Sequence, residues 1–259
     1  MIDFEHIKQQ YPQNLQRFER AILREYLQCK VLQAIFESLH ASRLALLGGT
    51  ALRIVYGNNR FSEDIDLDNF DLSWSEFEAV VQKVKRFLGL EGFKVEIRNV
   101  TKGAYRCHLK FPKILYKQGL SPLRDEKILV QVDTTAQDYP YEPEIRLLNK
   151  FDVFTDIRVT PLNILLSQKI YTAVNRKRPM GRDFYDITYL AGRTKPEMGF
   201  LKQKLGVDTA EGLREAVSSR ISRYDFKQLA EDVAPFLLYQ GDIKRVEKFR
   251  EFWTQLALE

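Results

Sequence analysis

Residues 44–70 constrain the fold of this chain more than any other stretch. They read LALLGGTALRIVYGNNRFSEDIDLDNF. The apolar run Leu44 to Leu47 predicts a strand, the two glycines after it a turn, and residues 51–56 a short helix. After a second turn, alternating residues predict another strand that carries Asp64 and Asp66. The sequence therefore predicts an α/β unit in which a glycine turn precedes an acidic strand.

The acids and the glycine turn together indicate a nucleotide site. Asp64 and Asp66 share one face of their strand, because strand side chains alternate. Two neighbouring carboxylates repel each other, and Mg²⁺, which prefers oxygen ligands, removes that repulsion. Gly48 and Gly49 allow a ligand close to the backbone, and helix-opening N–H groups with the Thr50 hydroxyl favour a triphosphate. Thr50 as a helix N-cap is a compatible alternative.

The joint pattern GGTAL and RxSxDIDL resembles the nucleotidyltransferase-fold toxins of the AbiEii/AbiGii type, close to the MenT-like toxins. The matching residues are Gly48, Gly49, Thr50, Arg60, Ser62, Asp64 and Asp66. The resemblance implies the DNA polymerase β-like nucleotidyltransferase fold and a site role for Arg60 and Ser62. It also implies a toxin of a bacterial toxin–antitoxin or phage-defence pair, with an antitoxin encoded beside it. From the residues alone, Arg60 could instead pair with Glu63 or Asp64.

Nucleotidyl transfer by two Mg²⁺ ions requires about three carboxylates. Asp133 is our candidate for the third, because it follows the strongly β-forming residues 128–132 and shares a face with Leu129 and Gln131. The resemblance likewise implies a third acid on a later strand. Glu96, on a predicted strand over 94–100, is the alternative. Asp68 continues the alternation, and we expect it to be a solvated neighbour.

A second block, LLSQKIYTAVNRKRPMGRDFYDI, resembles the family's lysine helix followed by RDxYD. Lys169 and Arg176 are seven positions apart and share a helical face. The resemblance implies that Lys169 contacts the triphosphate in catalysis and that Asp183 orients a basic site residue. Arg176 and Arg182 belong to a basic cluster that, taken alone, is typical of a solvated loop; the resemblance implies that it suits an RNA acceptor. An ordinary surface lysine and a helix-cap Asp183 are the alternatives, and we assign Asp186 to structure.

The rest of the chain predicts an α+β protein with a mixed sheet flanked by helices and a helical C-terminal part. Ser73 and Glu76 form a capping-box pattern that opens a helix. Strands are expected at 94–100, 105–111 and 128–134, with a turn at Gly103, and further strands or a linker over 138–160. Helices are expected within 14–39, from Pro161, and at 183–190, 197–205, 209–219, 225–239 (capped by Asp225) and 242–258. We predict two domains, 1–160 and 161–259, the second contributing basic residues to the active-site cleft.

Composition excludes several other classes of protein. Among 259 residues there are 2 cysteines and 3 histidines, too few for a disulfide framework or a His/Cys metal site. His40 and His108 are expected to be packed. There is no apolar run of about eighteen residues and no secretory signal pattern, which predicts a cytoplasmic protein without a membrane span. The net charge of +5 permits a polyanionic partner.

Two acids at this spacing also occur in phosphatases that form an aspartyl-phosphate and in glycosyltransferases. The polar stretch RFSE before Asp64 argues against the first, and the glycine turn against the second. A non-enzymatic module that binds nucleic acid or a partner protein is the alternative from another class. The sequence thus predicts a Mg²⁺-dependent enzyme that transfers NMP from an NTP to a hydroxyl acceptor. The family resemblance implies that this acceptor is an RNA, such as the 3′ end of tRNA.

Overall fold

The computed structural model describes residues 3–101 and 104–258 and divides the chain into two compact units. The first unit is Met1–Gly57 with Phe61–Val159, and the second is Asn58–Arg60 with Thr160–Glu259. The three residues Asn58–Arg60 therefore belong to the second unit, although the chain on both sides of them belongs to the first. The turn predicted at Gly103 lies outside the described residues.

The first unit contains a seven-stranded mixed sheet in the order β3-β4-β5-β2-β1-β7-β6. The β2/β5 and β1/β7 pairs are parallel and the other neighbours are antiparallel. The mixed sheet confirms the predicted fold class, and the stretch 138–160 holds a hairpin of two strands. The strands are β1 (Leu44–Leu47), β2 (Ile65–Asn69), β3 (Glu96–Thr101), β4 (Tyr105–Pro112), β5 (Lys127–Ala136), β6 (Glu144–Lys150) and β7 (Val153–Val159).

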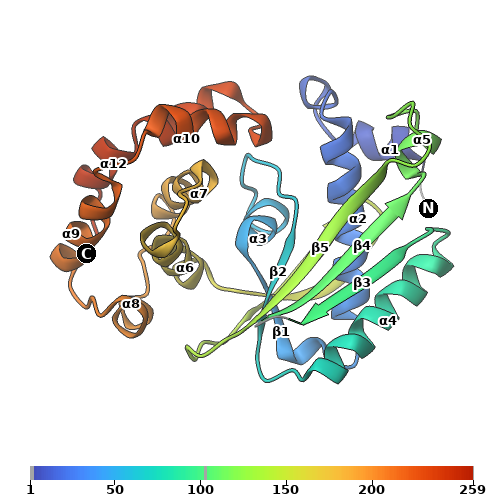
Figure 1. The fold of residues 1–259 in the computed structure, drawn as a ribbon, viewed down its shortest axis with the longest axis horizontal. Helices are drawn as coiled ribbons and strands as arrows, with labels where there is room; N and C mark the ends of the chain where they lie inside the picture. The colour runs from blue at the N-terminus through green and yellow to red at the C-terminus, as the bar shows by residue number, and fades with distance from the viewer. Residues whose placement is uncertain (1–2, 102–103, 259) are drawn as a thin grey trace. The chain divides into compact units, whose positions relative to one another are not determined.

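Two long helices, α2 and α4, lie together on one side of strands β3 to β5 (Figure 1). The predicted capping box opens α4: the Ser73 side chain accepts from the Glu76 N–H, and the Glu76 carboxylate accepts from the Ser73 N–H at 2.9 Å. The helical elements of this unit are α1 (Phe4–Gln9), η1 (Gln13–Leu15), α2 (Glu19–Phe36), η2 (Ala41–Arg43), α3 (Gly48–Ile54), α4 (Trp74–Leu90) and α5 (Ile114–Lys117).

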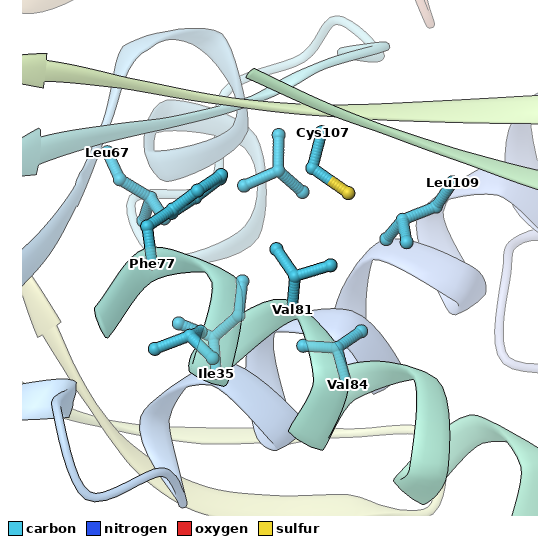
Figure 2. A pocket seen from close by; sticks show the side chains of 9 residues that line it. Ile35, Leu67, Phe77, Val81, Val84, Cys107 and Leu109 are labelled. Atoms are coloured by element: carbon cyan, nitrogen blue, oxygen red, sulfur yellow. The ribbon is translucent and has the colours of Figure 1, made fainter. Parts of the chain in front are cut away.

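The helix-covered face of the sheet is apolar. Figure 2 shows Phe77, Val81 and Val84 of α4 pointing toward Cys107 and Leu109 on β4. Leu67 of β2 and Val132 of β5 line the same space. Since neighbouring strand residues point to opposite sides, residues 66, 106 and 133 lie on the other face. Burial of the alternate positions thus places the polar residues of three strands together.

The described part of the second unit consists of helices joined by loops, with an isolated antiparallel β-bridge between Arg60 and Leu237. Asp225 caps α10 as predicted, accepting from the N–H groups of Lys227 (2.9 Å) and Gln228 (3.2 Å). Pro161 is the N-cap of α6. The helices are α6 (Leu162–Asn175), α7 (Gly181–Ala191), α8 (Met198–Leu205), α9 (Ala210–Ile221), α10 (Phe226–Val233), η3 (Ala234–Phe236), η4 (Gln240–Ile243), α11 (Lys244–Glu247) and α12 (Phe249–Gln255).

The prediction of one continuous helix over 242–258 is wrong, because the backbone leaves the helical conformation at Lys248 (φ −96°, ψ 18°). The apolar spacing survives this break: Val246, Phe249 and Trp253 are all fully buried, and Phe249 stacks on Trp253 at an interplanar angle of 14°. The periodicity of apolar residues alone therefore could not reveal the break at Lys248. Among the described residues, no helix is both long and apolar enough to cross a membrane.

Candidate active site

The turn after β1 lies directly against an acid of β2. Gly48 has φ +72°, a conformation that side chains disfavour, and a Cβ added to it would lie 2.6 Å from Oδ2 of Asp66. Glycine is therefore required here both by the backbone conformation and by the space that the carboxylate fills. Helix α3 begins at Gly48, three residues earlier than predicted, so Gly49 and Thr50 lie in its first turn.

Thr50 connects this helix to the acidic strand. Its side chain is fully buried, and its hydroxyl donates a short hydrogen bond to the carbonyl oxygen of Asp64. The N-cap of α3 is Leu47, so Thr50 as N-cap is wrong. Thr50 instead fixes the backbone where Asp64 enters β2, and its contact with a triphosphate stays a prediction.

The register of the sheet brings a third acid next to the first two. Asp66 on β2 is the Cα partner of Asp133 on the parallel strand β5. Partners in register point to the same side, so Asp133 lies beside Asp66. Asp64 immediately precedes β2, and strand alternation predicts the same side for it. Glu96 as the alternative is wrong: β4 and β5 separate its strand from β2, and its carboxylate lies 2.7 Å from Lys127 Nζ.

Arg106 is a member of this cluster that sequence reasoning missed. It is the register partner of Asp133 on β4, and its Nε and Nη2 donate to the two oxygens of Asp133 at 2.7 and 3.0 Å. This hydrogen-bonded carboxylate is the main reason that the pKa of Arg106 is raised, and the charges of Asp64 and Asp66 add to the effect. The alternation of residues 105–111 could have placed Arg106 on the acidic face, but only the strand order identifies its partner.

The acids of this cluster offer the oxygen donors that a hard cation prefers, and the backbone of Gly48 lies beside Asp66. Within residues 3–101 and 104–258, no three His, Cys, Asp or Glu side chains converge closely enough to hold a metal ion. In this structure Asp133 is instead bound by Arg106 and by Gln131 Nε2, at 3.0 Å. Metal binding by Asp64, Asp66 and Asp133 stays a prediction.

The neighbours of the acids serve the fold. Asp68 as a solvated residue is wrong, because it is buried and accepts a hydrogen bond from the Tyr141 hydroxyl at 2.5 Å. Ser62 is half-buried, and its carbonyl accepts from Gln28 Nε2 at 3.2 Å. The contact of Ser62 with substrate stays a prediction.

In the second unit, Lys169 lies between two buried carboxylates. Its Nζ is 2.9 Å from Asp186 Oδ2 on α7 and 3.4 Å from Asp183 Oδ1. Asp183 also lies 3.2 Å from Arg176 Nη1, so it contacts two basic side chains. The N-cap of α7 is Met180, so the alternative of Asp183 as a cap is wrong. Arg182 is half-buried in the first turn of α7.

Arg60 belongs to this second cluster. Its Nε and Nη2 donate to the two oxygens of Asp186 at 2.7 and 2.6 Å, and Asn58 Nδ2 donates at 3.0 Å. Burial by itself raises the pKa of Asp186, but Arg60 and Lys169 lower it by more than burial raises it, so that it falls to about 2. The carboxylate that Arg60 pairs with is therefore that of Asp186, and the alternative partner Glu63 pairs with Arg24 at 2.6 Å. The Arg60 guanidinium supports the helical unit, and direct substrate binding by it stays a prediction.

Two solved structures have a similar fold. The structure is similar to the crystal structure of JHP933 from Helicobacter pylori, with a TM-score of 0.55, 16% identity and coverage of 91% of this chain and 92% of that one. It is also similar to MenT4, a nucleotidyltransferase toxin from Mycobacterium tuberculosis H37Rv, with a TM-score of 0.53, 17% identity and coverage of 92% and 85%. At such identities the likeness shows a shared fold. No curated protein matches the chain in sequence.

The sequence profile described as "Nucleotidyl transferase AbiEii toxin, Type IV TA system" matches residues 30–254. The match spans both units and confirms the resemblance drawn from the glycine turn, the acidic strand and the lysine helix. The chain belongs to the AbiEii nucleotidyl transferase toxin family of type IV toxin–antitoxin systems and is a nucleotidyltransferase.

Proposed function

We propose that this toxin is a Mg²⁺-dependent enzyme that transfers NMP from an NTP to a hydroxyl of an RNA, such as the 3′ end of tRNA. The observation that carries the proposal is the register of Asp66 with Asp133, beside a glycine whose backbone lies against Asp66. Neighbouring carboxylates on one face repel each other, and a fold that keeps them together beside bare backbone is suited to cations and phosphate.

Asp64, Asp66 and Asp133 would hold the metal. When bound, two Mg²⁺ ions would activate the attacking hydroxyl and stabilise the charge on the triphosphate. The chain's own residues fix the geometry of the acids: Thr50 holds the backbone at Asp64, and Gly48 leaves space for the Asp66 carboxylate. The backbone N–H groups of Gly48 and Gly49 would bind the nucleotide, as the family resemblance implies.

The helical unit would supply positive charge to the same reaction. Lys169 is held by two carboxylates, so its ammonium has a fixed position and little rotamer entropy to lose on binding phosphate. The segment that follows contains Arg176, Lys177, Arg178 and Arg182, of which Lys177 and Arg178 are exposed. Phosphate contacts by such side chains position a nucleic acid without reading its sequence.

The family membership implies a nucleotide substrate and a cognate antitoxin. We propose that the toxin acts in the cytoplasm, where NTPs and tRNA are both available, and that its biological role is phage defence. Arrest of translation by a blocked tRNA 3′ end would give such a system its effect.

The experiment is incubation of the protein with total RNA and each labelled NTP, with Mg²⁺ or with EDTA. We expect label transfer that depends on Mg²⁺ and is lost in Asp64→Ala and Asp66→Asn. Asp125→Ala, which removes an exposed acid of the same unit, is the matched control and should keep full activity. Transfer that survives Asp64→Ala removes this residue from the mechanism. No transfer to any RNA or protein contradicts the proposal and favours a module that only binds nucleic acid or a partner.

A further inference from the structure

The bond between Arg106 and Asp133 joins a cation to the acidic face of the sheet. Arg106 holds both oxygens of Asp133, at 2.7 and 3.0 Å, and Gln131 donates to one of them at 3.0 Å. Asp133 accepts these three bonds through the oxygens that a divalent cation would need. A cation can therefore use Asp133 fully only if Arg106 moves away.

Because both side chains of the pair contact water, separating them costs little free energy. The Arg106 side chain is 46% exposed and that of Asp133 is 20% exposed. Ion pairs with this much contact with water contribute little net stability, because water solvates the separated partners well. Arg106 can thus exchange partners without disturbing the core, unlike the buried Arg60, whose side chain is 3% exposed.

An arginine on the acidic face reduces the repulsion between its carboxylates. Like charges on adjacent strands destabilise a sheet, and three acids lie on this face. Arg106 lies close enough to Asp64 and Asp66 for their charges to raise its pKa in addition to the main effect of Asp133. In the absence of metal, its single positive charge offsets part of the repulsion.

We propose that Arg106 is an exchangeable counter-cation: it occupies Asp133 until a divalent cation and nucleotide bind, and its guanidinium then binds the phosphate oxygens of the nucleotide. The planar fork that fits the Asp133 carboxylate also fits a phosphate in the same bidentate way. Metal and nucleotide then bind cooperatively, because the metal releases Arg106 and the nucleotide gives it a new partner. This inference rests on the proposed metal site at Asp64, Asp66 and Asp133.

The test is the affinity for Mn²⁺, which replaces Mg²⁺ at oxygen sites, measured by electron paramagnetic resonance on nucleotide-free protein. We expect Arg106→Ala to bind Mn²⁺ about tenfold more tightly than the unaltered protein, because it loses a competing charge. With saturating Mn²⁺, the same variant should bind α,β-methylene nucleoside triphosphates about tenfold more weakly, as expected for a lost bidentate phosphate contact. A residue that only supports the fold would not shift the two affinities in opposite directions.

Arg146→Ala is the matched control. Arg146 is 52% exposed and holds Glu144 on β6 through two nitrogens, so the variant removes the same charge and the same kind of pair. It should leave both affinities unchanged. Arg106→Gln repeats the measurement with a side chain that keeps hydrogen bonding, should Arg106→Ala not fold.

Equal Mn²⁺ affinities in Arg106→Ala, Arg106→Gln and Arg146→Ala overturn the inference, and so does the absence of Mn²⁺ binding in all variants. The first result, together with label transfer that depends on Asp64, would remove the role of Arg106 and leave the proposed function in place. Tighter Mn²⁺ binding in Arg106→Ala without transfer to any RNA would support the exchange and contradict the RNA acceptor.

Discussion

The carboxylate of Asp66 lies so close to the main chain of Gly48 that a Cβ at position 48 would be 2.6 Å from Oδ2 of Asp66. Gly48→Ala must therefore displace the carboxylate in addition to straining a backbone with φ +72°. The strain itself costs roughly 1–2 kcal/mol of unfolding free energy. We expect nucleotidyl transfer to fall by about 100-fold, because displacement of a site group by about 1 Å has effects of that size.

Gly119→Ala is the control for this variant. Gly119 has φ +70° and no heavy atom within 4 Å of an added Cβ, so it isolates the backbone strain. Gly119→Ala should lose similar stability in chemical denaturation and retain transfer activity. Equal loss of transfer in both variants would contradict the role given to the Gly48–Asp66 contact.

Asp186→Asn should strongly destabilise the helical unit. The carboxylate is fully buried and neutralises two cations, so its removal leaves Arg60 buried at 3% exposure without its acid. Breaking such a pair costs about 3–5 kcal/mol, whereas replacing both partners with apolar residues costs much less. Hydrogen exchange of the α7 amides measures the loss. Arg60→Met with Asp186→Leu should be more stable than Asp186→Asn, and additive losses would contradict the pairing.

The lowered pKa of Asp186 predicts that the free energy of unfolding depends on pH. The pKa of Asp186 is lowered from 3.8 to about 2, so the unfolded chain binds a proton at a higher pH than the folded chain does. Its contribution is fully present above about pH 4 and is lost as the pH falls toward 2, amounting to about 2 kcal/mol. Unfolding free energies of the unaltered protein should decline more steeply between pH 4 and 2 than those of Asp186→Asn. Parallel curves would show that Asp186 is not the titrating group.

Lys169→Ala should lower both activity and stability. Its side chain is 14% exposed and compensates two carboxylates that are at most 2% exposed. Its loss should cost about 2–3 kcal/mol, somewhat less than a fully buried pair. Lys202→Ala is the control, because its pair with Asp208 is 67% and 56% exposed and should change stability by less than about 0.5 kcal/mol. Lys169→Arg should restore most of the stability, and the comparison is made by thermal and chemical denaturation.

Both cysteine thiols should be unreactive in the folded protein. Cys29 and Cys107 are fully buried, and burial raises the pKa of Cys29 and brings that of Cys107 to about 12. Little reactive thiolate exists at such values. Titration with a chromogenic disulfide at pH 8 should detect no thiol until denaturant is added, and two thereafter. Fast reaction of one thiol in the native state would show local opening of the sheet or of α2.

Local patterns predicted the central unit well. The apolar run, glycine turn and alternating acids each reflect rules that act within a few residues, and β1, α3 and β2 follow in that order. Such local rules do not predict that Asp133 lies beside Asp66, because this contact depends on the parallel pairing of β5 with β2. The family resemblance supplied the expectation of a third acid, and alternation supplied its face.

The remaining errors concern partners that are distant in sequence. Arg60 and Asp186 are separated by 126 positions, and nothing near Arg60 indicates that its carboxylate comes from α7 rather than from Glu63. Glu96 lies on the same face of the sheet as Asp133, but the strand order places β4 and β5 between its strand and β2. Arg106 could have been placed on a face by alternation, yet its contact with Asp133 follows only from the pairing of β4 with β5.

The three residues Asn58–Arg60 have a consequence for engineering. A gene fragment that ends at residue 159 would carry Arg60 without its acid, and one that starts at residue 160 would carry Asp186 without its base. Neither fragment is a complete folding module. A chimera that exchanges the helical half between relatives must transplant this tripeptide together with the C-terminal hundred residues.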